Sequence, residues 1–189
     1  MRRLVVPLIA LILLPAYVPA QTRVHPADST MLSRIAFGSC NRESMRQPLW
    51  KLIADKEPQL WIWLGDNIYG DTDNMRVMRA KYGQQLRQPS YREFRRQVPV
   101  IGTWDDHDYG LNNGGREYRA RAASQQALLD FLDEPVESAR RRQEGVHSGE
   151  FNRHRVGNLV VALNYGIIDV DWAQADPVIR FASTTTKMQ

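Results

Sequence analysis

Short apolar runs alternate along the chain with segments in which apolar residues recur every three or four positions. A short apolar run predicts a buried strand, and the wider spacing predicts a helix with one apolar face. We therefore expect strands at 34–37, 60–64 and 98–103 and helices at 48–55 and 72–86; a short helix is also expected at 91–97, and one at 117–132 from its content of alanine, glutamine and leucine. The order strand, helix, strand, helices, strand predicts an α/β fold that is built on a parallel sheet.

The pattern is less regular in the last third of the chain. The segment 140–143 is expected to be exposed, and further β-rich segments are expected at 146–151, 159–163 and 167–170. The last two of these flank Asn164-Tyr-Gly166, a composition that is typical of a hairpin turn. The tail from Thr184 onward is expected to be disordered.

The first twenty residues predict export. Two arginines precede an apolar run at 4–14, and Val18 and Ala20 place small residues at the minus-three and minus-one positions of a cleavage site. This pattern is typical of a secretory signal peptide at 1–20, and the apolar run is too short to span a bilayer. We expect a periplasmic or extracellular protein without a membrane span, in which residues 21–189 form a single domain.

Composition and charge narrow the class of protein only a little. Apolar residues make up 43% of the 189 residues, which is enough for a core of ordinary size. Removing the two arginines of the leader lowers the formal net charge from +4 to about +2. Arginines cluster at 92–96, 116–121 and 140–142. Solvated helix faces explain such clusters more often than nucleic-acid binding does, so a basic binding module is the weaker alternative and no specific nucleic acid is expected.

Polar side chains follow each of the three expected strands. The clusters are Gly38-Ser-Cys40 after the first strand, Asp66, Asn67, Tyr69 and Asp71 after the second, and Asp105, Asp106, His107 and Asp108 after the third. Because the carboxyl ends of parallel strands meet at one edge of a sheet, we expect these clusters to converge. Turns and helix caps are the plain alternative for each cluster. Cys40 is the only cysteine, and considered alone it would be favoured as a small buried hydrophobe.

The converging side chains make poor core material, because buried charges need partners. A metal ion supplies such a partner: thiolate and phenolate suit a transition metal, whereas carboxylate and amide oxygens suit calcium, magnesium or manganese. A mixed set fits two metals that share an aspartate, an arrangement that binds phosphoryl oxygens and activates water. A histidine beside the ligands can donate a proton to a leaving group.

Other catalytic classes find less support in the sequence. It contains no Gly-x-Ser-x-Gly elbow, no phosphate-binding loop and no dinucleotide motif. A cysteine hydrolase, in which Cys40 attacks and His107 acts as base, stays open as an alternative. The acidic residues around the expected site disfavour it, because nearby negative charge opposes formation of a thiolate.

Three motifs, in this order, resemble the alkaline phosphatase D (PhoD-like) family of metallophosphoesterases. They are Gly38-Ser-Cys40, Leu64-Gly-Asp-Asn-Ile-Tyr-Gly-Asp71, and Thr103-Trp-Asp-Asp-His-Asp108 followed by Asn112-Asn113. The resemblance runs from about residue 34 to 151 and resumes in the last forty residues. It implies a metallophosphoesterase-like αββα sandwich, a secreted enzyme that hydrolyses phosphate mono- or diesters of small molecules, and a centre of iron and calcium.

The resemblance also implies roles for individual residues. Cys40 is similar to a ligand of the iron, Asp66 to the bridging carboxylate, and Tyr69 to the phenolate on iron. Asp106 occupies the place of an asparagine ligand in the wider metallophosphoesterase pattern, and His107 that of the histidine near the leaving group. Asp71, Asp105, Asp108 and Asn112 are expected to be loop or supporting residues at least as readily as ligands.

One departure from the family is large. Its members are longer, and a later Gly-Asp-x-His type segment supplies further ligands that this sequence lacks. We interpret this as an internal deletion near residues 150–153, which makes the expected sandwich incomplete. His147 and His154 are candidate replacements, although their spacing does not favour it. The alternative to an active enzyme is therefore a catalytically inactive remnant of the family, with or without retained binding of metal or phosphate.

Overall fold

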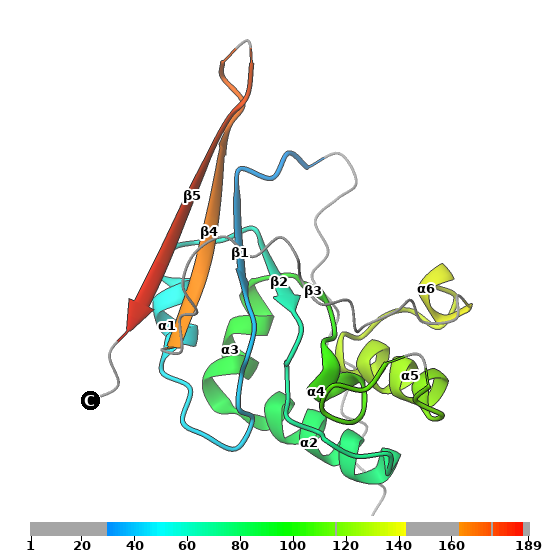
Figure 1. Cartoon of the computed structure of the whole chain (residues 1–189). Helices are drawn as coiled ribbons and strands as arrows, with labels where there is room; N and C mark the ends of the chain where they lie inside the picture. Colours follow the sequence, from blue (N-terminus) through cyan, green and yellow to red (C-terminus); the bar gives the residue numbers. More distant parts are fainter. Residues whose placement is uncertain (1–29, 116, 143–162, 175, 187–189) are drawn as a thin grey trace, which may run out of the picture.

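A mixed five-stranded sheet lies at the centre of the molecule (Figure 1). The structure is a computed structural model, and it describes residues 30–115, 117–142, 163–174 and 176–186. The strand order is β3-β2-β1-β4-β5. Strands β1 (Arg34–Gly38), β2 (Leu60–Leu64) and β3 (Val100–Thr103) are parallel, whereas β4 (Leu163–Asp171) and β5 (Val178–Thr186) join antiparallel. Mixed α/β architecture is thus confirmed.

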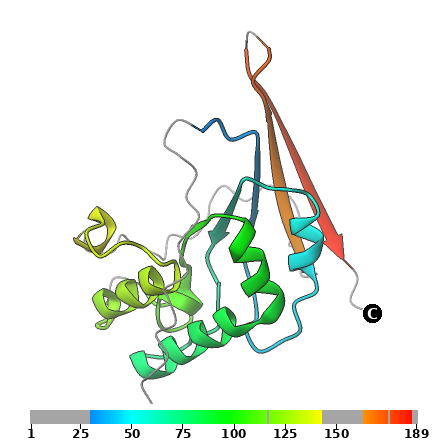
Figure 2. The ribbon, with the colours of Figure 1, turned by 180° about the vertical axis from the view of Figure 1, so that it is seen from behind.

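The described residues form six helices. They are α1 (Leu49–Ala54), α2 (Met75–Arg87), α3 (Pro89–Gln97), α4 (Asp106–Tyr109), α5 (Arg121–Phe131) and α6 (Ala139–Arg142). Seen from behind, α1 and α3 lie across one face of the sheet (Figure 2). All four helices expected from the sequence are present, with ends that differ by a few residues.

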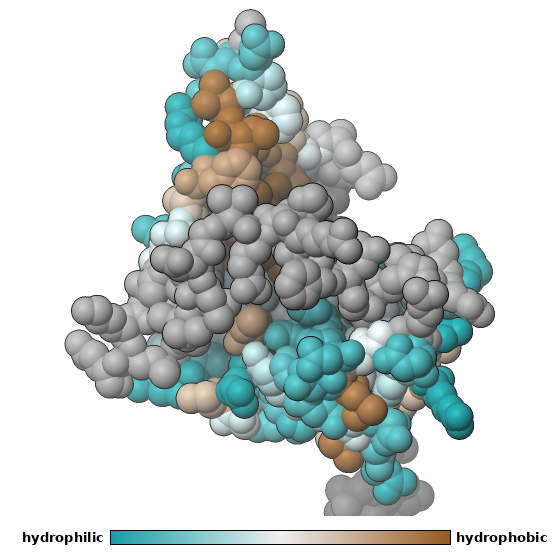
Figure 3. Space-filling model, in the orientation of Figure 1, coloured by the Kyte–Doolittle hydropathy of each residue, from teal (hydrophilic) through white to brown (hydrophobic). Residues whose placement is uncertain are grey.

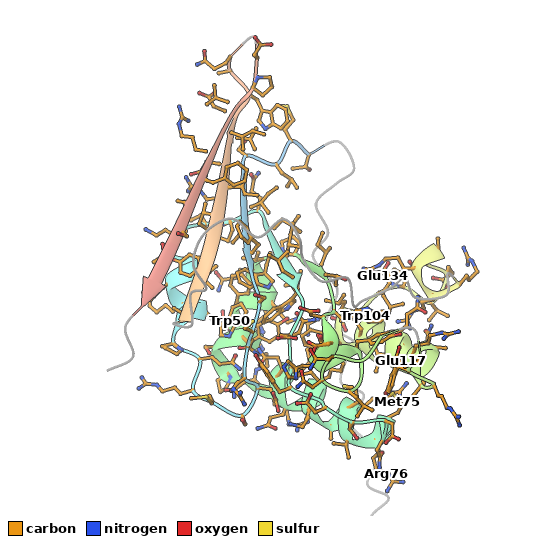
Figure 4. All side chains as sticks on the ribbon, viewed as in Figure 1. Trp50, Met75, Arg76, Trp104, Glu117 and Glu134 are labelled. Atoms are coloured by element: carbon orange, nitrogen blue, oxygen red, sulfur yellow. The ribbon has the colours of Figure 1, made fainter. Side chains whose placement is uncertain are left out.

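An aromatic cluster joins that face of the sheet to the helices. Trp50 of α1, labelled in Figure 4, packs with ring centroids 5.1 Å from Trp61 and 5.3 Å from Trp63 of β2. Phe94 of α3 lies 5.1 Å from Trp50 as well. Large buried aromatic side chains contribute about 1.5–3 kcal/mol each to folding relative to exposure. The core therefore sits between β2 and the helices that follow β1 and precede β3.

The end of the chain differs from the sequence-based expectation. Residues 163–171 form one continuous strand, so the prediction of a hairpin turn at Asn164-Tyr-Gly166 is wrong. Tyr165 is buried, and the ring of Phe37 fills the space where a Cβ on Gly166 would lie. The glycine thus serves close packing between β1 and β4. The tail from Thr184 is not disordered as far as Thr186, because β5 pairs with β4 over that stretch.

The segment at 140–143 forms a short helix as far as Arg142, with contacts to the rest of the molecule. Arg140 donates a hydrogen bond of 2.8 Å to the Gly102 carbonyl and pairs with Glu134 at 3.1 Å. Arg141 pairs with Asp130 at 3.0 Å. These arginines therefore stabilise α6 against its neighbours in place of forming a purely solvated basic face.

Several expectations fall on other parts of the chain. The proposed signal peptide at 1–20, the strand at 146–151 and the deletion point near 150–153 lie outside the described residues.

The described residues form a single sheet, so the two-sheet αββα sandwich is not confirmed. None of the described helices combines the length and the apolar character that crossing a bilayer requires.

Candidate metal centre

Three loops meet where the parallel strands β1, β2 and β3 end. Trp104, labelled in Figure 4, directly follows β3 and marks this edge of the sheet. Main-chain hydrogen bonds join the loops: the amide of Asn41 donates to the carbonyl of Asp66 at 2.8 Å, and the amide of Gly70 donates to the carbonyl of His107 at 3.0 Å. The convergence expected from the strand order is therefore present in the structure.

Close approach of the loops requires glycine after β2. Gly65 has φ of 105°, and a Cβ at this position would lie 2.6 Å from the Cβ of Asp105. Real Cβ atoms do not come this close to other heavy atoms, so any other residue would push the two loops apart. The glycine thus sets the distance between the second and the third polar cluster.

The loops also concentrate left-handed backbone at non-glycine residues. Four of the six such residues in the described chain lie in these loops. They are Cys40, Asp66, Asp71 and Asn113, with φ of 56°, 49°, 48° and 59°. This conformation costs about 1–2 kcal/mol for a residue with a Cβ, less for Asn and Asp. Backbone strain of this kind gathers at functional sites because the required side-chain placement outweighs its cost.

Asp66, Asp106 and His107 form the centre of the site. Each offers one ligand atom, and these atoms lie within 4.8 Å of one another. Asp66 is 8% exposed, and its Oδ1 atom has no hydrogen-bond partner. Burial raises the pKa of Asp66, although the charge of His107 opposes the shift. A buried carboxylate oxygen without a partner is costly, and a cation at this point would supply one.

The side chain of Cys40 lies beside this centre, within contact distance of Asp66. Its Sγ is 3.7 Å from Oδ2 of Asp66. The residue is exposed, so the expectation of a small buried hydrophobe, which the residue type alone favours, is wrong. Partial burial of the thiol and the charge of Asp66 raise its pKa, although Ser39 opposes the shift. A thiol that resists ionisation is a poor nucleophile, and in the described chain no hydrogen bond joins it to His107.

Tyr69 packs between a histidine and an arginine. Its ring centroid lies 4.3 Å from that of His107, and the guanidinium carbon of Arg42 lies 4.3 Å from the same ring. Burial, together with Cys40 and Asp66, raises the pKa of the phenol, and Arg42 opposes the shift. The Tyr69 amide donates to the nearly buried carboxylate of Glu43 at 3.1 Å.

His107 is oriented by a carboxylate from another loop. Its Nδ1 lies 2.6 Å from Oδ1 of Asp71. Burial lowers the pKa of His107, but the hydrogen bond to Asp71 and the charges of Asp66, Asp71 and Asp106 outweigh it and raise the pKa above its ordinary value. With Nδ1 engaged, Nε2 is the nitrogen that is left to bind a ligand or to carry a transferable proton.

Asp108 holds the loop after β2 against α4. The side chain is fully buried, and its two oxygens accept hydrogen bonds from the amides of Asp66 and Asn67 at 3.1 Å and of Asp105 at 2.8 Å. Burial raises the pKa of Asp108 to about 8 while these amide donors oppose the shift. Asp105 caps α4 in a reciprocal capping box with Asp108. Both aspartates therefore support the loops, which is one of the two roles expected for them from the sequence.

The structure brings together all five residues that the sequence singled out. Cys40, Asp66, Asp106 and His107 come from the ends of the three parallel strands, and Tyr69 joins them through its contact with His107. Their roles as ligands or as proton donor remain predictions. His147 and His154 lie outside the described residues.

Two residues at the site were not found from the sequence. Arg42 follows Cys40 by two positions, and nothing in its spacing indicates a contact with Tyr69. Glu43 is 2% exposed, which is unusual for a glutamate, but its burial depends on Lys81 of α2, whose ammonium lies 2.7 Å from its carboxylate. The signal that could have found both is their place two and three residues after the Gly-Ser-Cys motif of the first polar cluster.

Comparison with known proteins adds little to this geometry. No model of a protein family matches the chain, and no curated protein matches it. A solved structure of PhoD is similar over 61% of this chain, with a TM-score of 0.48 and 21% sequence identity. The matched region amounts to 28% of the PhoD chain, so the protein spans well under half of that neighbour's length. A likeness of this size carries no functional argument, and the site is interpreted from its own residues.

Proposed function

We propose that the protein is an exported, metal-dependent phosphoesterase of the alkaline phosphatase D type, which hydrolyses phosphate mono- or diesters. The observation that carries the proposal is the cluster of Asp66, Asp106 and His107, whose ligand atoms lie within 4.8 Å of one another around a buried, unpartnered carboxylate oxygen. The motifs that resemble PhoD-like enzymes support the same reaction class. Neither observation identifies the natural substrate.

The donor set fits a cation. Two carboxylates and an imidazole, with the thiol of Cys40 at 3.7 Å from Asp66, suit a transition metal, and the remaining carboxylate oxygens suit calcium. Asp66 and Asp106 would hold the ion, with Cys40 and Tyr69 as further candidates. When bound, such an ion polarises a phosphoryl oxygen and makes an attacking water more acidic. Iron and calcium, the ions that the family resemblance implies, are both compatible with this set.

The chain's own residues supply orientation and a proton. The Asp66 and Asp106 carboxylates repel an anionic phosphoester, so its binding depends on positive charge brought to the site. Asp71 fixes the His107 ring through Nδ1 and, with the other carboxylates, favours the protonated form of the imidazole. Nε2 then carries a proton that it can donate to the departing oxygen of the ester. Asp71 thus positions the imidazole in this scheme, and His107 is the proton donor.

Metal content and hydrolysis test the proposal together. The purified protein is expected to retain metal by elemental analysis and to hydrolyse a chromogenic phosphoester, and Asp66→Asn is expected to lower the rate by about 100-fold or more. Asp73 is exposed and lies in the same loop between β2 and α2, so Asp73→Asn is the control. This variant should keep both the bound metal and the rate of hydrolysis. In the metal-free protein Asp66→Asn should unfold at no lower temperature than the unmodified chain, because it removes the charge of a buried carboxylate whose Oδ1 atom has no hydrogen-bond partner.

A remnant without catalytic activity is the alternative. It is favoured by the described part of the chain, which offers one three-residue ligand group, whereas the resemblance implies a larger metal shell. A protein that carries no metal and hydrolyses no faster than Asp66→Asn would establish this alternative. Metal retained without hydrolysis would indicate a remnant that still binds its ion.

A further inference from the structure

Two basic side chains approach the loop that carries Tyr69, and they differ in their partners. Lys81 of α2 reaches the carboxylate of Glu43 at 2.7 Å, and that carboxylate also accepts the amide of Tyr69. The charge of Lys81 is therefore neutralised by Glu43. Arg42 is exposed and rests over the Tyr69 ring at 4.3 Å, and within the described chain no carboxylate forms an ion pair with it. One positive charge at the site is thus left for a ligand.

The position of Arg42 relative to the metal-binding cluster gives that charge a use. The guanidinium lies 4.3 Å from the Tyr69 ring, and this ring lies 4.3 Å from the ring of His107. A substrate held at His107 is therefore within reach of the arginine. Stacking on an aromatic ring holds a guanidinium in place at little cost, and leaves the N–H groups at its edge free to donate.

The chemistry of the cluster points to an anion as the partner. A guanidinium presents paired donors whose geometry matches the oxygens of a phosphoryl group or a carboxylate. The aspartates of the site repel anions, so a fixed positive charge beside them offsets part of that repulsion. A neutral substrate could accept hydrogen bonds from the guanidinium but would gain no attraction between opposite charges.

We propose that Arg42 is a substrate-binding residue, which donates hydrogen bonds to phosphoryl oxygens of the ester while Tyr69 holds its guanidinium in place. The inference rests on the proposed function, because it assigns the anionic part of the substrate in the same site. It adds a residue outside the metal-ligand motifs, and it makes the charge of the phosphoryl group, more than the organic part of the ester, the feature that Arg42 recognises.

Binding of inorganic phosphate to the metal-supplemented protein tests this assignment directly. Isothermal titration calorimetry is run on the unmodified chain, on Arg42→Ala and Arg42→Lys, and on Arg46→Ala as a matched control, since Arg46 is exposed four residues further along the same loop. Arg42→Ala is expected to weaken phosphate binding about tenfold or more. Arg42→Lys should weaken it by a smaller factor, because an ammonium keeps the charge and loses the paired donors. Arg46→Ala should stay within about twofold of the unmodified chain.

The outcomes separate this inference from the proposed function. If Arg42→Ala binds phosphate as tightly as the unmodified chain, if Arg46→Ala weakens binding equally, or if the unmodified chain binds no phosphate, the assignment is overturned. Phosphate binding that depends on Arg42, without hydrolysis of any phosphoester, supports the assignment and contradicts the enzyme. Far-ultraviolet circular dichroism establishes that each variant is folded; should Arg42→Ala unfold, a Lys variant that binds phosphate as well as the unmodified chain would count against the inference.

Discussion

The imidazole of His107 is surrounded by negative charge on several sides. Asp71 contacts it directly, and Asp66 and Asp106 lie close enough to raise its pKa further. Because this pKa is higher in the folded protein than in the unfolded chain, folding strengthens the binding of one proton. The resulting stabilisation is fully present below the unfolded value, 6.5, and is lost as the pH rises through the higher folded value.

Replacement of Asp71 should reduce this upward shift of the His107 pKa. In the metal-free protein we expect His107 to titrate above 6.5, and in Asp71→Asn we expect its pKa to fall, because burial then acts with less opposition. Nuclear magnetic resonance titration of the imidazole protons measures both values. Asp73→Asn is the control, since Asp73 is exposed two residues further on and no contact joins it to His107 in the described chain. An unchanged pKa in Asp71→Asn, or an equal fall in both variants, would contradict this account.

Between elements, several of the hydrogen bonds that connect the β2 loop to α4 converge on one carboxylate. Asp108 accepts from three main-chain amides and from the side-chain amide of Asn67 at 2.5 Å. Each of these donors is buried or partly buried. Besides the main-chain hydrogen bonds to His107, the loop that carries Asp66 is therefore held to the helix that carries Asp106 and His107 by hydrogen bonds to this side chain.

An amide in place of this carboxylate should loosen the connection. Asp108→Asn keeps the shape of the side chain but replaces one acceptor by a donor that faces other donors, so we expect a loss of about 2–3 kcal/mol in the free energy of unfolding. Urea denaturation of the metal-free protein at about pH 9, where a carboxyl with a pKa of about 8 is mostly ionised, measures this loss. The same change at Asp55, which pairs with Lys51 on the surface of α1, should cost about 0.5 kcal/mol or less. Equal losses at the two positions would show that the burial of Asp108 is of no consequence.

Elements with a strong local signal could be predicted from the sequence. The apolar run at 60–64 is β2 with the same limits, because every residue in it is apolar and the run is as short as a buried strand. The interpretation of Asn164-Tyr-Gly166 as a turn fails because contact with Phe37 across the sheet, which no local pattern reveals, requires the glycine. The threonines at 184–186 form a strand because pairing with β4 outweighs their polarity.

The candidate site likewise combines contacts that the sequence predicts with contacts that it does not. The meeting of Cys40, Asp66 and Asp106 follows from the parallel order of three strands, which apolar spacing predicts. The pairing of Asp71 with His107 depends on a left-handed residue and on the packing of two loops, and neither leaves a mark in sequence spacing. The contact of Arg42 with Tyr69 depends likewise on the course of the first loop.

At the scale of the molecule, the sheet ends in an exposed strand. The hairpin of β4 and β5 projects beyond the helices (Figure 1), and its surface carries hydrophobic side chains (Figure 3). Phe181 and Ile179 of β5 are 73% and 55% exposed. β5 is the last strand in the sheet order, so within the described chain no further strand pairs with its outer edge. A long exposed edge with few charges is a hazard for association between molecules.

A charge on this edge should reduce self-association. Phe181→Lys is expected to lower the concentration-dependent light scattering of the purified protein by several-fold while changing its melting temperature little, because the side chain is exposed. Val136→Lys is the matched control, since Val136 is 81% exposed and lies outside the strands. If both variants reduce scattering equally, net charge and not the strand edge is responsible.

Amide and carbonyl groups are present whatever side chain a residue carries, and hydrogen bonds between such groups connect the loops of the site in addition to those of Asp108. The course of the loops therefore survives an exchange of the donor atoms displayed at positions 40, 69 and 106. Substitutions at these positions can therefore change which side-chain atoms the loops present while the path of the main chain is kept.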